Sequence, residues 1–547
     1  MTAPSALDNR KLLLLALAAL IVWFANLDYR KLIKPDEGRY AEISREMAAS
    51  GDWVTPRLNG IKYFEKPPLH YWAGAAAFSL FGQHEWTARL WSGLTGVLGI
   101  LLAWYTGRRL FGATAGLYGA AALGSCLMYV VVGHLNTLDM GLTLFLFGTL
   151  CALLLAQRDG ASARENAVCM HLASAAMAGA VLTKGLVGVV IPGATLILYT
   201  LAQRDWRLWR RLHIATGLLL FLAITAPWFI VVSLRNPEFA WFFFVHEHFL
   251  RYTTTIHQRV EPWYYFLPLL VVGWVPWTAV VVDALWHAWR KDPGTTFQPR
   301  RLLLIWCAFV FLFFSASGSK LPSYILPLFP AAALLTGWRL SSISGTRLAW
   351  QILPMSLLGL GGLIALPLVR TSGDTPIALI QAFKPWIAGA ALMALVGPIY
   401  AGWRARRGDV ALAVAVTGIA GLVGMQLIVT GHESLSPSTS AYLMAQEVKP
   451  YLRPDIPFYS VSTYDQTLDY YLGRTVTLVQ FRDEMDFGLK QEPKLAIPTI
   501  EAWMDVWKQQ PYALAYVEKG VYEQLRAADF PMELIANDHR RYFIKTP

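Results

Sequence analysis

Acidic, basic and aromatic residues gather in two short stretches of a chain that is otherwise apolar. Residues 35–40 read Pro-Asp-Glu-Gly-Arg-Tyr, and residues 63–68 read Tyr-Phe-Glu-Lys-Pro-Pro. Charged groups beside a bilayer are costly unless they pair or handle a substrate, so such a cluster indicates a functional site. Carboxylates among cations and tyrosine hydroxyls suit a reaction in which cations hold a phosphate and a carboxylate faces the reacting carbon or its attacker.

Further polar groups stand at the ends of the apolar segments, and each has a plainer interpretation beside the functional one. Asp36 and Glu37 could be solvated acids at the membrane surface, and Asp139 could cap a helix. Lys184 and Lys320 could extend their ammonium groups to the interface. The candidate catalytic residues are Asp36 and Asp139, and the candidate phosphate or substrate ligands are Lys66, Arg251, Arg39, Lys320, Tyr324, Glu37, Tyr40, Tyr63 and Lys184.

A divalent metal ion is a further possibility, held by Glu65 and a histidine such as His246. Carboxylate and imidazole are both suitable ligands, but the sequence shows no fixed ligand spacing. Histidines at such positions more often pair with acids or cap helices. A metal site at Glu65 and His246 therefore remains a hypothesis.

Composition defines the class of protein to which these groups belong. Of 547 residues, 55% are hydrophobic and 15% are charged, and 22 are tryptophan. Mean hydropathy is +0.40. Such a chain is a membrane protein with many spans, because a soluble fold would leave too much apolar surface uncovered. The net charge of +11 comes from short clusters between apolar runs, which excludes a nucleic-acid-binding surface. All the cysteines fall in apolar segments and are expected to be small core residues: Cys126, Cys151, Cys169 and Cys307.

Apolar segments of about 20 residues predict about thirteen transmembrane helices. The first follows Arg10 and Lys11 and lacks a small-residue cleavage site, so we expect it to be retained. The predicted spans lie near residues 11–28, 86–108, 113–133, 137–157, 168–183, 185–203, 212–234, 263–288, 302–318, 322–340, 348–369, 385–403 and 409–430.

The basic clusters orient these spans. If Leu69–Phe81 lies on the membrane rather than crossing it, the later clusters fall on one side, which is the positive-inside pattern with a cytoplasmic N-terminus. The first outer loop, residues 29–85, then carries the polar cluster, with a short interfacial helix at Ala41–Ala49. Nucleotide sugars are absent outside the cytoplasm, so an enzyme there would use a group carried on a lipid phosphate.

Beyond residue 430 the pattern changes. Short apolar runs alternate with helical stretches through residues 431–547, which predicts a small extracytoplasmic α/β domain after a transmembrane domain at residues 1–430. This region shows no metal, nucleotide or nucleophile motif, so we expect a lid or an interaction module. The predicted fold class is thus mainly α and polytopic, with a small C-terminal α/β domain.

Several of these motifs carry a family resemblance. Five stretches of the chain resemble the bacterial 4-amino-4-deoxy-L-arabinose lipid A transferases. They are the run from Pro35 to Met47, Tyr-Phe-Glu-Lys-Pro at 63–67, Leu-Thr-Lys-Gly at 182–185, Pro-Trp-Tyr-Tyr at 262–265 and Gly-Ser-Lys-Leu-Pro-Ser-Tyr-Ile-Leu at 318–326. These belong to the polyprenyl-phosphate-dependent (GT-C type) membrane glycosyltransferases, with the protein O-mannosyltransferases. The match runs through about the first 340 residues, and Pro68-Leu69-His70 departs toward the wider class.

The resemblance implies an inverting enzyme of the inner membrane that works as a monomer, with its site and C-terminal domain facing the periplasm. It would move aminoarabinose from undecaprenyl phosphate to lipid A phosphates, lowering their negative charge and giving polymyxin resistance. A phosphomonoester, with its second pKa about 6, is largely anionic at neutral pH, so a strong base is unnecessary. Asp36 would stabilise the cationic sugar centre, and Asp139 would support it or hold the sugar's ammonium group. The cations Lys66, Arg251, Arg39 and Lys320, with Tyr324, would neutralise the leaving phosphate.

Two alternatives stay open. A protein O-mannosyltransferase-like enzyme would transfer another sugar to a hydroxyl, with Asp36 as an obligatory base. A lipid or sugar transporter would also have many spans and charged groups, but transporters tend to show paired internal repeats, and the sequence shows none.

Overall fold

The computed structural model describes residues 9–250, 261–370, 375–538 and 540–547. The chain forms two compact units, which are described separately. The first, here called the helical unit, comprises Met1–Leu27, Trp91–Thr371 and Gln381–Gly431. The second, here called the mixed unit, comprises Asp28–Leu90, Ser372–Ile380 and His432–Pro547.

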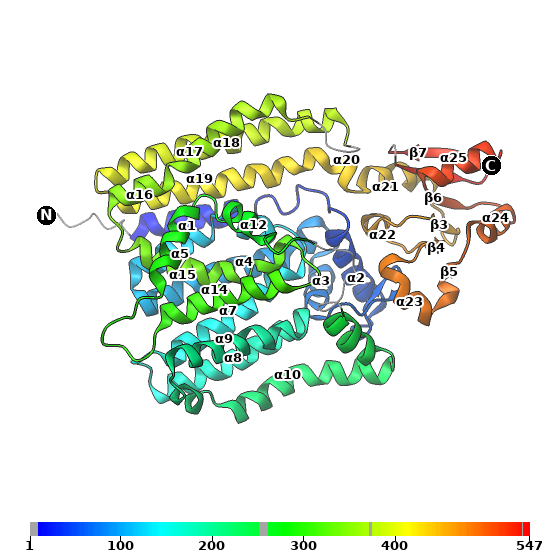
Figure 1. Ribbon diagram of the computed structural model, residues 1–547. Helices are drawn as coiled ribbons and strands as arrows, with labels where there is room; N and C mark the ends of the chain where they lie inside the picture. Colours follow the sequence, from blue (N-terminus) through cyan, green and yellow to red (C-terminus); the bar gives the residue numbers. More distant parts are fainter. Residues whose placement is uncertain (1–8, 251–260, 371–374, 539) are drawn as a thin grey trace. The chain divides into compact units, whose positions relative to one another are not determined.

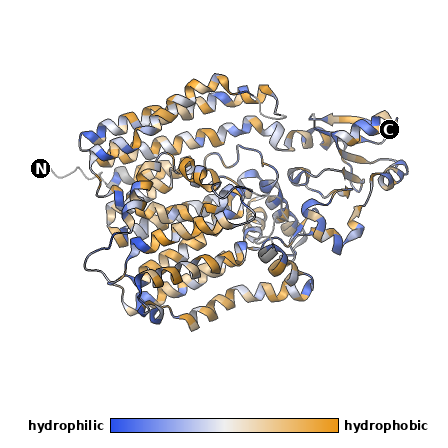
Figure 2. Cartoon of the chain, viewed as in Figure 1, coloured by the Kyte–Doolittle hydropathy of each residue, from blue (hydrophilic) through white to orange (hydrophobic). Residues whose placement is uncertain are grey.

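The helical unit is a bundle of apolar helices (Figure 1). Within it α7 packs along α8, α8 along α9 and α10, and α15 along α5 and α14. Hydrophobic residues predominate along these helices, and hydrophilic residues gather near the helix ends (Figure 2). The main elements are α1 (Asn9–Phe24), α4 (Glu85–Phe111), α5 (Ala113–Leu123), α6 (Leu127–Gly133), α7 (Leu138–Gln157), α8 (Ala163–Lys184), α9 (Val187–Gln203), α10 (Ile214–Arg235), the π-helix η2 (Trp241–Leu250), α12 (Phe266–Gly273), α13 (Thr278–Ala288), α14 (Pro299–Ala316), the 3-10 turn η3 (Pro322–Ile325), α15 (Leu328–Leu340), α16 (Gly345–Ile352), α17 (Pro354–Ala365), α18 (Ile377–Arg406) and α19 (Val410–Gly431).

The protein is a multi-pass membrane protein. Among the described residues, 8 helices are long and apolar enough to cross a bilayer, or up to 10 if each of two bent pairs is one span. The bent pairs are α5 with α6, at 65°, and α12 with α13, at 111°. The count of about thirteen is not confirmed, because the segments near 113–133 and 263–288 are sharply bent and that near 322–340 is reduced to η3 and the 13-residue α15.

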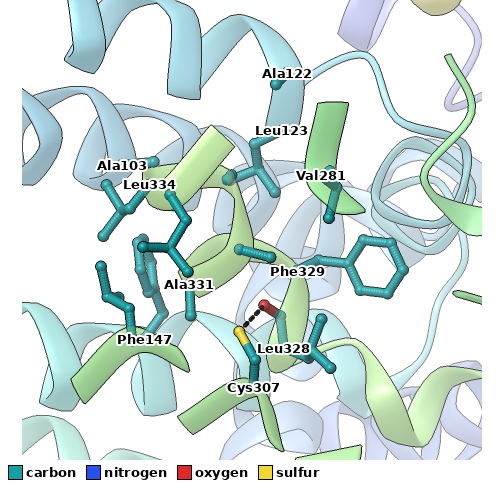
Figure 3. Close-up of a cluster of buried hydrophobic side chains, with 14 of the residues drawn as sticks. Ala103, Ala122, Leu123, Phe147, Val281, Cys307, Leu328, Phe329, Ala331 and Leu334 are labelled. Carbon is teal, nitrogen blue, oxygen red and sulfur yellow. Dashed lines mark hydrogen bonds between the residues drawn. The ribbon is translucent and has the colours of Figure 1, made fainter. Parts of the chain in front are cut away.

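The core of the helical unit lies around α15. Phe329 and Leu334 of α15 are fully buried and pack among Leu123, Phe147 and other apolar side chains (Figure 3). The thiol of Cys307, buried in the same cluster, lies 3.8 Å from the carbonyl oxygen of Leu328. The expectation that this cysteine is a small core residue agrees with its surroundings.

Glycines let α15 and α5 approach closely. A Cβ added to Gly337 would lie 2.2 Å from the carbonyl oxygen of Ala115 and within 3 Å of Gly119 backbone atoms. Real carbon atoms do not come so near, so any side chain at Gly337 would force the two helices apart. Small residues at such contacts are what allows membrane helices to pack backbone to backbone.

We therefore expect Gly337→Val to destabilise the folded protein by about 1–3 kcal/mol or more, as overpacking of a close helix contact does. The measurement is the fraction of protein that stays monodisperse in detergent after heating. Gly361→Val is the matched control, because a Cβ at Gly361 would meet nothing within 4 Å. Equal heat sensitivity of the two variants would contradict this account of the α5–α15 contact.

The mixed unit unites the polar segment after α1 with the C-terminal region. Its sheet has six strands in the order β5-β4-β3-β6-β8-β7, parallel from β5 to β6 and antiparallel at β8 and β7. The elements are α2 (Asp36–Ser50), β1 (Arg57–Leu58), β2 (Ile61–Lys62), α3 (Leu69–Phe81), η5 (His432–Leu435), α20 (Ser436–Thr439), α21 (Tyr442–Val448), β3 (Phe458–Val461), α22 (Gln466–Leu472), β4 (Thr477–Val479), α23 (Asp486–Gln491), β5 (Ala496–Ile497), α24 (Ile500–Lys508), β6 (Leu514–Glu518), α25 (Lys519–Ala527), β7 (Glu533–Asn537) and β8 (Arg541–Lys545).

The mixed unit confirms strands in the C-terminal region but differs from two expectations. Its compact body includes residues 28–90, so it does not begin at residue 431. The reason is that α2 packs on α3 and on α22, and a Cβ at Gly38 would lie 2.6 Å from the backbone of Gln466. The interfacial helix expected at Ala41–Ala49 is instead part of α2, with Ala41, Ile43 and Met47 buried.

Candidate active site

The helix α2 begins at Asp36, directly after Pro35, and places two adjacent acids in its first turn. Acids are favourable there because the helix dipole is positive at this end. Their surroundings differ sharply: the side chain of Asp36 is 40% exposed, whereas that of Glu37 is 3% exposed. The carboxylate of Asp36 is therefore accessible from outside the protein, whereas that of Glu37 is closed off.

Glu37 is the centre of a buried ion-pair network. Its carboxylate accepts hydrogen bonds from Arg89 Nε at 2.7 Å and Nη2 at 2.9 Å, and from the backbone N–H of Ile33 at 3.0 Å. Arg89 also donates to the carbonyl oxygens of Arg30 at 2.6 Å and Lys31 at 3.0 Å. The network fixes the segment that leads into α2, and this favours a structural role for Glu37 over the predicted contact with substrate.

Arg39 lies between two carboxylates. Its Nη1 lies 2.5 Å from Asp36 Oδ1, and its Nε pairs with Glu484, which precedes α23. Glu484 also accepts a hydrogen bond from Gln466 Nε2 at 2.5 Å. Burial raises the pKa of Glu484, and Arg39 offsets part of that rise. The C-terminal region thus supplies a carboxylate that pairs with the cation beside Asp36.

Three buried tyrosines surround this charged group. Tyr40 and Tyr63 were predicted as candidates, and Tyr71 of α3 joins them. Burial raises the pKa of all three hydroxyls, so they stay protonated at neutral pH. The hydroxyl of Tyr71 is buried and has no hydrogen-bond partner among the described residues, which makes it available to a ligand. Tyr71 was not singled out from the sequence, because Leu69–Phe81 was interpreted only as an apolar segment.

Lys66 and Glu65 follow the same cluster in the chain. Lys66 Nζ donates to the carbonyl oxygen of Glu65 at 2.8 Å and lies 3.8 Å from its carboxylate. Both side chains are mostly buried, at 12% exposure for Lys66 and 19% for Glu65. An ammonium group held this far from water interacts strongly with any anion that reaches it.

The helical unit holds a second polar cluster, around Asp139. Asp139 stands in the first turn of α7, where its carboxylate pairs with Lys184 at the end of α8 and accepts a hydrogen bond from Ser323 Oγ at 2.8 Å. Lys184 also lies 4.5 Å above the ring of Tyr324. Thr137 occupies the N-cap position, so Asp139 is not the cap that its sequence position allowed. Three separate segments thus meet at this carboxylate.

Lys320 has a local role in the same unit. Its Nζ donates to the carbonyl oxygens of Glu261 and Ser317, both at 2.9 Å, and the residue is 7% exposed. It therefore ties two loops together rather than extending to the interface. The predicted phosphate ligand Arg251 lies outside the described residues.

The proposed metal ligands receive limited support. His246 lies on η2, where Nδ1 is 3.2 Å from Glu247 Oε1 and the ring stacks on Phe242 at 4.9 Å. Within the described part of the chain, no group of three or more His, Cys, Asp or Glu residues could hold a metal ion. Glu65 and His246 remain a predicted pair only.

A large apolar hollow opens in the helical unit beside Lys184. Its volume is about 700 Å³, and its lining includes Val181 and Gly185, which lie on either side of Lys184 in the chain. Side chains of α9, α10 and η2 complete it, among them Val189, Phe229 and Phe243. A hollow of this size and polarity suits a hydrocarbon chain.

The comparisons with known proteins agree with this arrangement. Residues 65–231 match the dolichyl-phosphate-mannose-protein mannosyltransferase family, and residues 444–546 match the aminoarabinose transferase C-terminal domain. The fold is also similar to that of the Archaeoglobus fulgidus oligosaccharyltransferase. The two sequences are 13% identical, and the structures superpose with a TM-score of 0.51 over 92% of this chain and 69% of the other. The chain thus has the fold of the membrane glycosyltransferases that use lipid-linked sugars.

Closer relatives narrow the class. The crystal structure of ArnT from Cupriavidus metallidurans bound to undecaprenyl phosphate is 40% identical, covers 98% of both chains and has a TM-score of 0.94. The undecaprenyl phosphate-alpha-4-amino-4-deoxy-L-arabinose arabinosyl transferase of Aeromonas salmonicida is 33% identical over 71% of this chain and 70% of its own. That of Edwardsiella ictaluri is 35% identical, and the chain spans 64% of its length. This protein belongs to the aminoarabinose transferase family.

Proposed function

We propose that this protein transfers 4-amino-4-deoxy-L-arabinose from undecaprenyl phosphate to phosphate groups of lipid A, with inversion at the anomeric carbon. The observation that carries the proposal is its likeness, over 98% of both chains, to a transferase crystallised with undecaprenyl phosphate. The protein would act in the bacterial inner membrane, with the mixed unit in the periplasm and one chain as the working unit. The product lipid would carry less negative charge and would bind polymyxin and other cationic peptides less well.

The acceptor's chemistry decides what the carboxylates must do. A phosphomonoester has a second pKa of about 6, so its oxygen is already anionic at neutral pH and needs no strong base. As the bond between the sugar and its carrier phosphate breaks, positive charge develops on the sugar. Asp36, partly exposed at the start of α2, would stabilise that charge.

The cations would neutralise the negative charge that develops on the carrier phosphate as its bond to the sugar breaks. Lys66 is a mostly buried ammonium group that would receive the negative charge of the leaving phosphate. Arg39 is already held by Asp36 and Glu484, so we assign it to the orientation of Asp36. Arg251 is the second phosphate ligand that the motifs predict.

The cluster around Asp139 would serve the sugar or its carrier. Asp139 is paired with Lys184 and bonded by Ser323, so its charge is largely balanced before substrate arrives. The apolar hollow lined by Val181 and Gly185 would hold part of the polyprenyl tail. This arrangement lets one helix end, that of α8, supply both a charged group and a wall of the hydrocarbon site.

Residues 65–231 match the mannosyltransferase family, so transfer of a sugar to a hydroxyl acceptor is the alternative function to be tested. The test supplies membranes containing the protein with undecaprenyl-phosphate aminoarabinose and one of three acceptors: lipid A, dephosphorylated lipid A or a serine- and threonine-rich peptide. We expect mass spectrometry to show a pentosamine added to lipid A alone. Addition to the peptide, or to lipid A without phosphates, would overturn the proposal.

A further inference from the structure

The mixed unit contains a second hollow, with a polar lining, at the far end of α2 from Asp36. Its volume is about 380 Å³, which is near the lower end of the usual range for small-ligand pockets. Guanidinium groups from three separate elements line it: Arg45 from α2, Arg57 from β1 and Arg474 from the segment between α22 and β4. Thr55, Thr475 and Ser50 add hydroxyl groups to the wall.

The three arginines are held in place but keep donors to spare. Arg45 donates to both oxygens of Glu42, at 2.7 and 2.6 Å, and Arg57 donates to both oxygens of Glu492, at 3.0 Å each. Arg474 donates from Nη2 to the carbonyl oxygen of Ile456 at 2.8 Å. Arg45 and Arg57 each donate one further hydrogen bond to a backbone carbonyl oxygen. A guanidinium carries five N–H donors, so each of the three groups keeps donors that can bind a ligand.

The acids beside the hollow do not cancel this charge at neutral pH. Glu46 accepts a hydrogen bond from the backbone N–H of Gly60 at 2.8 Å and lies beside Glu42. Burial and the charge of Glu42 raise the pKa of Glu46 to about 8, so Glu46 is mostly neutral at pH 7. Asp469, buried on α22 and bonded by Tyr464, also has its pKa raised by burial and by Glu42. Among the residues that line the hollow, the three arginines thus face one acid, Glu46, which is mostly neutral at pH 7.

We propose that this hollow binds a phosphate group. Planar guanidinium forks match phosphate oxygens with two parallel bonds, and hydroxyl groups complete the shell. A neutral sugar alone would leave the positive wall unbalanced, and an acyl chain would meet a polar lining. The phosphate can come from free inorganic phosphate or, resting on the proposed function, from a second phosphate of the lipid acceptor.

Binding of phosphate ligands to the full-length protein in detergent tests this inference. The ligands are inorganic phosphate, lipid A with two phosphates and lipid A with one, and the variants are Arg474→Gln alone and with Arg57→Gln. Loss of one charge-assisted contact typically weakens binding about tenfold. We expect the affinity of the double variant to fall about tenfold or more for inorganic phosphate, for the bisphosphorylated lipid, or for both. The ligand whose affinity falls identifies the source of the phosphate.

The control is Arg482→Gln, because Arg482 is 73% exposed in the same unit and does not line the hollow. Unchanged affinity of the double variant for all three ligands would overturn the inference. Because binding is measured without turnover, an enzyme that fails to transfer aminoarabinose would contradict the proposed function and leave this test intact.

The pH dependence of binding supplies an independent check. Between pH 7 and 9 Glu46 loses its proton and adds a negative charge to the wall, so affinity for phosphate falls several-fold in the wild type. In Glu46→Gln that fall is expected to disappear, with heat stability measured to show that the variant is folded. A fall of the same size in Glu46→Gln and in the wild type would contradict the role given to Glu46.

Discussion

We expect Asp36→Asn to abolish detectable transfer, a loss of at least about 10²–10³-fold, while the protein still reaches the membrane and binds donor. The substitution keeps the shape of the side chain and removes the negative charge that, in the proposed mechanism, stabilises the cationic sugar centre. Arg39, now lacking one of its two carboxylate partners, would further disfavour positive charge at that place. The measurement is the initial rate of sugar addition to lipid A at saturating donor.

A matched substitution separates charge at this position from charge in general. Asp505 is an exposed acid on α24 of the same unit, and Asp505→Asn should transfer at the wild-type rate. Near-normal turnover by Asp36→Asn would remove Asp36 from the mechanism.

We expect Lys66→Ala to weaken donor binding by about 10- to 150-fold and to lower turnover as well, because charge-assisted hydrogen bonds contribute about 1.5–3 kcal/mol. Lys66 would hold the carrier phosphate in the ground state and would neutralise it further as the sugar departs. Both effects follow from one mostly buried ammonium group. Equilibrium binding of undecaprenyl phosphate and single-turnover rates measure them separately.

Lys490→Ala is the control for Lys66, since Lys490 is 63% exposed and pairs with Asp486, one turn away on the same helix. It should leave both donor binding and turnover unchanged. Wild-type affinity of Lys66→Ala for undecaprenyl phosphate would reject the phosphate role of Lys66.

The helix that carries the acidic pair was predicted only in part. The sequence predicted a short helix at Ala41–Ala49, whereas α2 begins five residues earlier, at Asp36, where two acids in the first turn are favourable beside the helix dipole. The composition predicted a multi-pass membrane protein, and the alternating pattern after residue 430 predicted strands. The 13 residues of α3 are too few to cross a bilayer, as the positive-inside argument required.

The contacts across long sequence separations were not readable. Nothing local to Arg39 indicates Glu484, and nothing local to Asp139 indicates that Lys184 and Ser323 will bind its carboxylate. The different environments of Asp36 and Glu37 also depend on Arg89, which comes from another helix. Hydropathy measures how apolar a segment is and not whether it bends, so a prediction from hydropathy counts the bent pair α5 and α6 as one straight span.

Purified protein mixed with undecaprenyl-phosphate aminoarabinose and lipid A tests the central claim most directly. The account predicts that undecaprenyl phosphate is released and aminoarabinose appears on lipid A phosphate in equal amounts, and that both stop in Asp36→Asn. Release of undecaprenyl phosphate without any gain of mass on lipid A would contradict it.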